Sequence, residues 1–303
     1  MNYFFTYLKG IAMGAADVVP GVSGGTIAFI TGIYDTLLQS IRRINPALFG
    51  IWRQQGLKAV LNHVNAGFLL ALFGGILTSI LTLAKLISWL LETHPIPLWS
   101  FFFGLIIISI IHVLKQVETK HWSRLITLVL GFMFAYTITV AKPLDLEPTS
   151  INIILSGSIA ICAMILPGIS GSFILLLLGM YTPILAAVKG LEFGVLGLFA
   201  IGAITGILCF SHLLSWLLAK FRDFTLTFLT GLMIGTLPKI WPWKETISWR
   251  TNSHGQEVPL VQHNLLPFDY TNVVGEPSQL GLAVVCMLLG IGLVWGLERL
   301  TQD

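Results

Sequence analysis

The sequence predicts an all-α integral membrane protein made of two inverted repeats, each a re-entrant helical hairpin followed by three transmembrane helices. Hydrophobic residues fill 55% of the 303 positions and charged residues only 10%, whereas a soluble chain carries about 25% charged residues. Several apolar stretches reach the roughly 20 residues that are needed to cross about 30 Å of hydrocarbon. A short Pro-Gly motif also occurs once in each half of the chain, inside an apolar stretch. Together these observations indicate a membrane protein with an internal duplication.

The duplicated motif reads PGVSGG at residues 20–25 and PGISGS at residues 167–172. When the halves are aligned at an offset of 147, residues 16–38 and 163–185 share nine identities in 23 positions. Hydrocarbon holds no water that could satisfy the backbone groups freed by a Pro-Gly break, so such a break is costly. Its presence at two matched positions favours a binding site of the kind that transporters build from broken helices.

The first repeat is expected at residues 1–145 and begins with its hairpin, at about 8–41. The apolar stretch from Gly10 to Val19 is long enough for a helix of about 15 Å, or half the bilayer. The hairpin should therefore enter the membrane, turn near mid-depth and leave by the same face. Residues 42–64 predict a basic amphipathic helix that lies on the membrane surface. Three spans follow, at about 66–91, 98–115 and 124–141.

The second repeat is expected at residues 146–303, with its hairpin at about 151–188 and a long outer loop at about 239–278. Its spans are expected at about 193–218, 224–238 and 279–298. The match continues beyond the hairpins, because GILT at residues 75–78 aligns with GAIT at residues 202–205 at an offset of 127. The change of offset indicates an insertion in the first repeat, around its surface helix. An odd number of spans in each repeat inverts the second repeat relative to the first.

The basic residues predict how the chain is oriented. In this arrangement eleven Lys and Arg residues fall in one set of loops and five in the other. The positive-inside rule then predicts that both termini are cytoplasmic. The net charge of +3 fits this role of the basic residues and does not indicate nucleic-acid binding. The outer loop holds Trp241, Trp243 and Trp249, which are expected to anchor it at the membrane interface.

The two motifs have the chemistry of an anion site. Proline ends the first arm of each hairpin, glycine permits the turn, and serine can cap the helix that follows. The free N–H groups and the positive end of that helix point at the turn. Two turns that approach from opposite sides would form one nest for an anion such as phosphate. The hairpin turns are Pro20 and Pro167, and the candidate phosphate-binding residues are Gly21, Ser23, Gly24, Gly25, Thr26, Gly168, Ser170, Gly171 and Ser172.

A structural interpretation of the same residues stays open, because glycines also permit tight helix packing and serines also cap helices that bind nothing. Asp17 lies just before the first turn, and its counterpart is Met164. An acid inside a membrane is costly, so Asp17 is either a proton or sodium coupling group or a cap for the turn. Lys85 and His212 form a second matched pair. They either relay an anionic headgroup at the two faces, or are a snorkelling lysine and a hydrogen-bonded histidine.

The first motif and its surroundings resemble a known family. GAADVVPGVSGGT at residues 14–26, GIY at residues 32–34 and PGISG at residues 167–171 are similar to the polyprenyl-phosphate (undecaprenyl-phosphate) transporters of prokaryotes. The resemblance covers nearly the whole chain. It implies that the protein returns the lipid carrier monophosphate from the outer to the cytoplasmic leaflet of the cytoplasmic membrane, for cell-wall and glycan synthesis. The partners that it implies are the polyprenyl-phosphate lipid and the membrane.

Two other functions are weighed against this one. Membrane undecaprenyl-pyrophosphate phosphatases share re-entrant hairpins and a Pro-Gly-x-Ser turn, but in those enzymes arginine follows the serine and a nearby helix carries paired glutamates. Here Gly24 and Gly171 follow the serines, and the sequence has no E-x-x-x-E pair. Hydrolysis needs cationic groups and a base or metal, so no enzyme activity is expected. The three cysteines lack metal-ligand spacing, so no metal or cofactor is expected. A transporter of another small anion or ion stays an alternative.

Overall fold

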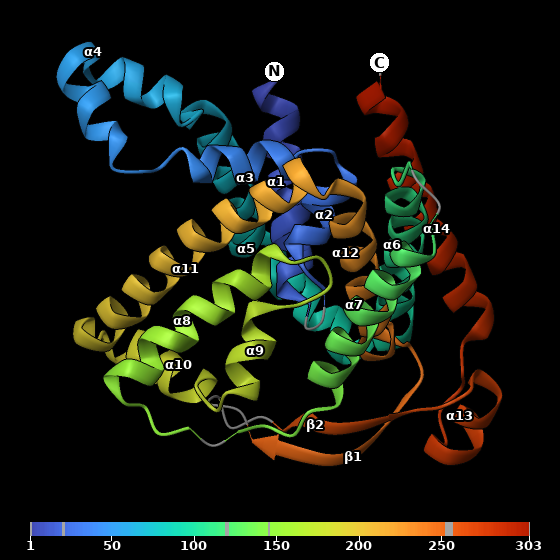
Figure 1. Cartoon of the computed structure of the whole chain (residues 1–303). Helices are drawn as coiled ribbons and strands as arrows, with labels where there is room; N and C mark the ends of the chain where they lie inside the picture. The colour runs from blue at the N-terminus through green and yellow to red at the C-terminus, as the bar shows by residue number, and fades with distance from the viewer. Residues whose placement is uncertain (1, 20–21, 119–120, 145, 252–256, 303) are drawn as a thin grey trace.

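The chain folds mainly into helices, and a β-hairpin lies at one end of the molecule (Figure 1). The computed structural model describes residues 2–302 apart from 20–21, 119–120, 145 and 252–256. The helices of the first half are α1 (Tyr3–Val18), α2 (Gly24–Ile30), α3 (Tyr34–Arg42), α4 (Ala47–His63), α5 (Ala66–Thr93), α6 (Pro95–Lys115) and α7 (Trp122–Val140). Those of the second half are α8 (Ser150–Ile165), α9 (Gly171–Leu177), α10 (Tyr181–Gly190), α11 (Phe193–Lys220), α12 (Arg222–Thr236), the 3₁₀ helix η1 (Leu237–Ile240), α13 (Pro267–Val274) and α14 (Leu280–Gln302).

The helix bounds repeat at the two offsets that the sequence alignment uses. Helices α1 and α8 both have 16 residues, and α2 and α9 both have 7, at an offset of 147. Helices α5 and α11 both have 28 residues, at an offset of 127. Their packing repeats as well, since α1 lies along α5 and α8 lies along α11. Gly75 lies against the carbonyl oxygen of Tyr7, and the matched Gly202 lies against that of Ile154. Glycine is needed at both positions because a Cβ there would overlap the opposing backbone.

The last helix of each half packs on the other half. Helix α7 lies along α12, and α14 lies along α6. The contacts again match, because Gly131 meets the carbonyl oxygen of Phe228 and Gly290 meets that of Phe101. The two halves are therefore interlocked and share one core, rather than forming two separate bundles.

Among the described residues four helices are long and apolar enough to cross a membrane, namely α5, α6, α7 and α11, or five spans if the bent pair of α9 and α10 is counted as one. Six spans were predicted from the sequence, and the structure has a helix at each position. Helix α12 has the predicted length of 15 residues but ends two residues earlier than predicted, where the chain tightens into η1, whose second residue is Pro238. Proline has no N–H to donate to an α-helical hydrogen bond. Helix α14 has 23 residues, and its segment Leu280–Gly296 is apolar.

Each hairpin has a second break that was not predicted. After the motif the returning arm runs for only seven residues, as α2 or α9. It then turns at a glycine with positive φ, which is 70° at Gly32 and 74° at Gly179. Helices α9 and α10 are bent by 111° relative to each other. A seven-residue helix is only about 10 Å long. Each returning arm is therefore short and ends at a turn.

The predicted surface helix at 42–64 corresponds to α4, which is kinked at Gly56 (φ 78°, ψ 178°) and buries none of its residues. It projects from the body at the same end as the start of α1 and the end of α14 (Figure 1). The predicted outer loop lies at the opposite end and contains an antiparallel pair, β1 (Lys244–Thr251) and β2 (Glu257–Asn264), followed by α13. The helical prediction did not include this β-hairpin. Its strands contain Ile247, Trp249 and Val258, residue types that favour extended structure.

Candidate functional site

The two duplicated motifs, far apart in sequence, lie in contact. We name residues 17–26 the first tip and residues 164–173 the second tip. The hydroxyl of Ser23 lies 3.1 Å from the carbonyl oxygen of Met164 and 3.2 Å from that of Leu166, so it donates to the backbone of the second tip. The same oxygen accepts from the N–H of Gly25 at 3.1 Å and thereby caps α2. Ser23 is completely buried, and its hydroxyl therefore joins helix capping to contact between the tips.

The second tip also donates to the first. The backbone N–H of Gly168 donates to the Thr26 Oγ1 at 3.0 Å. Gly168 has a φ of 89°, in the left-handed region that favours glycine. The phenol of Tyr34 donates to the carbonyl oxygen of Ile165 at 3.1 Å. Gly25 lies so close to that carbonyl group that a Cβ would come within 2.5 Å of its oxygen. The two tips thus hold each other through hydrogen bonds in both directions.

Asp17 contacts the first tip directly. Its Oδ1 accepts a hydrogen bond from the N–H of Gly24 at 2.7 Å. A Cβ on Gly24 would lie 2.5 Å from the Oδ2 of Asp17, so this glycine makes room for the carboxylate. The contact matches the capping role that was one of two alternatives for Asp17. It leaves the coupling role a prediction.

The second tip is more open than the first. Ser23 and Thr26 are 0% exposed, whereas Ser170 is 7% exposed and Ser172 is exposed. The Ser170 and Ser172 hydroxyls lie 2.8 Å apart, and Ser170 makes no side-chain cap to α9. A cavity of about 10 Å³ borders this tip, which is room for about one water. Its polar lining comes from Thr139, Gly168, Ser170, Thr236 and Lys239.

A second cavity, of about 70 Å³, lies where α2 meets α3. Its polar lining comes from Tyr34, Asp35, His112, Gln116 and Arg222. The Arg222 guanidinium and the Asp35 carboxylate form an ion pair across it at 3.6 Å. His112 and Lys239 stand at matched positions, at the offset of 127 that relates α6 to α12. Each cavity therefore has a basic side chain at the same place in its repeat.

The remaining candidates lie apart from these contacts. Lys85 on α5 and His212 on α11 are exposed, and neither lines either cavity. The ring nitrogen Nδ1 of His212 lies 2.8 Å from the carbonyl oxygen of Leu208 in its own helix. Pro20 and Gly21 lie outside the described residues, and Pro167 is buried. Among the described residues no group of three His, Cys, Asp or Glu side chains is arranged to hold a metal ion.

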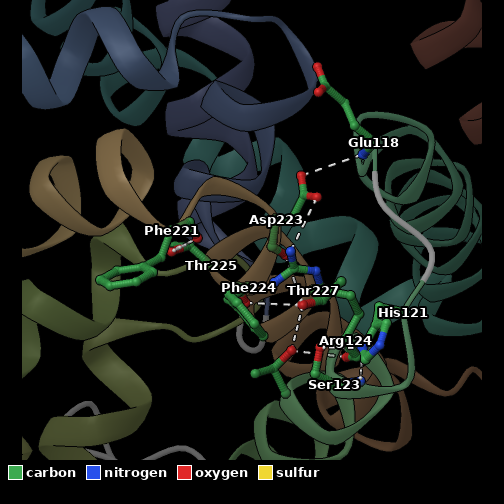
Figure 2. Close-up of polar contacts among 10 residues, drawn as sticks. Glu118, His121, Ser123, Arg124, Phe221, Asp223, Phe224, Thr225 and Thr227 are labelled. Carbon is green, nitrogen blue, oxygen red and sulfur yellow. Dashed lines mark hydrogen bonds and ion pairs between the residues drawn. The ribbon is translucent and has the colours of Figure 1, made fainter.

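Sequence reasoning missed a polar cluster between α7 and α12, shown in Figure 2. Arg124 pairs with Asp223 at 3.6 Å, and its guanidinium carbon lies 3.5 Å from the centre of the Phe224 ring. The hydroxyls of Thr127 and Thr227 lie 2.6 Å apart. In the sequence Arg124 is one of several basic residues beside a span, and nothing there pairs it with Asp223. The cluster joins the last helix of one half to the other half.

Comparison with known proteins places the chain in a family. Residues 13–258 match the VCA0040-like family, which is described as undecaprenyl phosphate translocase-like. A polyprenyl-phosphate transporter of Vibrio cholerae serotype O1 is 67% identical over 302 residues, 100% of this chain and 98% of the relative. A polyprenyl-phosphate transporter of Staphylococcus aureus is 32% identical over 256 residues, 78% of this chain and 85% of the relative. No solved structure matches. From the extent of the match, the chain belongs to the undecaprenyl phosphate translocase-like family.

Proposed function

We propose that the chain carries polyprenyl phosphate across the cytoplasmic membrane, with the phosphate held at the two tips and the isoprenoid tail in lipid. The observation that carries this proposal is the mutual contact of the tips, beside a cavity that has hydroxyl groups and a lysine. The phosphate is the part that needs a protein, because a charged group is prohibitively costly to place in hydrocarbon. The names of the two relatives support the choice of lipid.

The architecture in this proposal is a pair of inverted repeats, each with a re-entrant hairpin. Three observations support it: equal helix bounds, matched glycine contacts and the exchange of the last helices. Helices α1 and α8 have 16 residues each and reach about 24 Å, less than the hydrocarbon core. The start of α1 and the end of α14 share one end of the molecule with α4 (Figure 1). We assign that end to the cytoplasm because the predicted inner loops carry the excess of Lys and Arg.

The difference between the tips supports a mechanism of alternating access. In the first tip Ser23 and Thr26 are completely buried, whereas the second tip borders a cavity at the side of Lys239. In repeats of this kind, exchange of the two conformations gives the opposite state of the transporter. The first tip would then open while the second closes, and the phosphate would pass from one side to the other. Within this cycle Asp17 holds the N–H of Gly24 and keeps the first tip in shape.

Translocation in liposomes tests the function. The purified chain should move a polyprenyl monophosphate between leaflets, and protein-free liposomes should not. Ser23→Ala combined with Ser170→Ala should slow transport by about tenfold or more, since each hydroxyl contributes hydrogen bonds worth about 1 kcal/mol or more. Ser88→Ala is a matched control because Ser88 is exposed on α5, away from both tips. Transport that is unchanged in the double variant would contradict a role for the tips.

The same liposomes separate the alternatives. Release of inorganic phosphate from polyprenyl pyrophosphate would identify a phosphatase. Uptake of a soluble anion without movement of the lipid would identify a small-anion transporter. Neither is expected, and the relatives bear the name of transporters.

A further inference from the structure

Two lysines lie beside the second tip, in the segment that follows α12. Lys239 in η1 is half-buried, and its Nζ lies 4.9 Å from the centre of the Phe173 ring. It lines the same cavity as Gly168 and Ser170. The cation and the duplicated motif therefore border one space.

Lys244, at the start of β1, contacts the backbone of Lys239. Its Nζ donates to the carbonyl oxygen of Lys239 and lies 4.2 Å from the centre of the Trp99 ring. Burial lowers the pKa of both lysines, and the charge of Lys239 lowers that of Lys244 further, to about 7. Within the part of the chain that the structure describes, no carboxylate lies within 4.0 Å of either ammonium group. Two partly buried lysines without an acid beside them favour an anion, because a bound negative charge stabilises the protonated form of each lysine.

The matched position in the other repeat is different. His112 corresponds to Lys239, but its cavity contains the carboxylate of Asp35, which pairs with Arg222. The negative charge of Asp35 therefore partly neutralises the positive charge of Arg222 in that cavity. The cavity at Lys239 has hydroxyl groups and backbone, but no acid among its lining residues. Of the two cavities, the one at Lys239 is thus better suited to an anion.

We propose that Lys239, supported by Lys244, forms a receiving site for a phosphate monoester at the β-hairpin end of the molecule, next to the second tip. This inference rests on the proposed function and adds where the headgroup first binds. The hydroxyls of Ser170, Thr139 and Thr236 line the route from the lysine to the tip. The cavity has room for only about one water, so binding of the phosphate moves the Lys239 side chain off the Phe173 ring and widens the space. A lysine suits this role because it is a flexible point charge.

Binding of the full chain in lipid nanodiscs tests the site. The probes are a polyprenyl monophosphate, the matching neutral polyprenol and inorganic phosphate. Lys239→Gln should weaken binding of the lipid phosphate by about tenfold or more, the loss expected when one contact to a charged group is removed. Lys239→Arg should restore much of it, because it keeps the charge. Lys142→Gln is the control, since Lys142 is exposed and its loss changes the net charge equally.

The outcomes separate the site from the function. If Lys239→Gln binds as tightly as the wild type while the serine variants lose binding, the receiving site is wrong and the proposed function stands. If the wild type binds lipid phosphate no better than polyprenol, the proposed function fails. Competition by inorganic phosphate, lost in Lys239→Gln, would support recognition of the phosphate group alone. A Lys239-dependent site for inorganic phosphate without lipid binding would keep the site and assign it to the free anion. Thermal unfolding of each variant checks that it folds.

Discussion

The backbone N–H of Gly168 donates to the Thr26 Oγ1 at 3.0 Å, across 142 residues of sequence. Thr26 is completely buried, and Gly168 is buried beside it. The threonine hydroxyl is thus the partner of a backbone group that the second turn leaves free. One half of the chain supplies the donor of this hydrogen bond and the other half supplies the acceptor. The bond can therefore form only when the two tips are in contact.

Thr26→Val should weaken the contact between the tips. Valine has nearly the shape of threonine but cannot accept from Gly168, and an unpaired buried N–H costs about 1–3 kcal/mol. We expect a lower unfolding temperature in detergent, followed by the fluorescence of the nine tryptophans, and slower lipid translocation.

Thr205→Val is the matched control for this variant. Thr205 is exposed on α11, and its hydroxyl bonds only to carbonyl groups of its own helix. Equal unfolding temperatures and equal lipid translocation rates for the two variants would show that the Thr26 hydroxyl does not stabilise the contact between the tips.

Asp17→Asn should preserve transport together with its dependence on pH and sodium. The asparagine oxygen can still accept from the N–H of Gly24, which Asp17 now holds at 2.7 Å. Asp17→Leu removes the acceptor and should lower both stability and transport. The measurement is the translocation rate across a series of pH values and sodium concentrations. A loss of that dependence in Asp17→Asn alone would instead make Asp17 the coupling group.

Gly75→Ala and Gly202→Ala should destabilise the protein to a similar degree. In each case the new methyl group meets a backbone carbonyl oxygen of the packed helix, at Tyr7 or at Ile154. Overpacking of this kind costs about 1–3 kcal/mol. Gly197→Ala is the control on α11, because nothing lies within 4 Å of its Cβ position. If one of the two substitutions left the stability unchanged and the other lowered it strongly, the packing of the two matched glycines would not be equivalent.

Lys244→Met should gain stability relative to the wild type as the pH falls from about 10 to about 7. Burial, and then the charge of Lys239, lower the pKa of Lys244 from 10.5 to about 7. Between these values the unfolded chain binds a proton that the folded chain does not, so wild-type stability falls as the pH falls. Methionine does not titrate, so the variant lacks this loss of stability. Unfolding temperatures of both proteins over this range measure the effect.

A difference in unfolding temperature between Lys244→Met and the wild type that stays constant from about pH 10 to about pH 7 would contradict the lowered pKa of Lys244.

Much of the helical framework could be predicted from the sequence. The apolar stretches and the two offsets locate α5, α11 and the paired hairpin arms, because burial in hydrocarbon and internal hydrogen bonding leave few other choices for such segments. The second break of each hairpin was missed, although Gly32 and Gly179 are matched glycines with positive φ. Their conformation depends on how the short helices pack, and a glycine in a sequence does not reveal its φ.

The sequence by itself determined that the chain is helical, duplicated, and broken at two matched Pro-Gly motifs. Those properties follow from local composition and spacing. Only the tertiary structure decided that Ser23 and Thr26 bond to the second tip, and that Arg124 pairs with Asp223. It also decided that Lys239 shares a cavity with Ser170. The hydrogen bonds of Ser23 and Thr26 and the Arg124–Asp223 ion pair join residues from both halves, and their geometry arises only when the halves pack on each other.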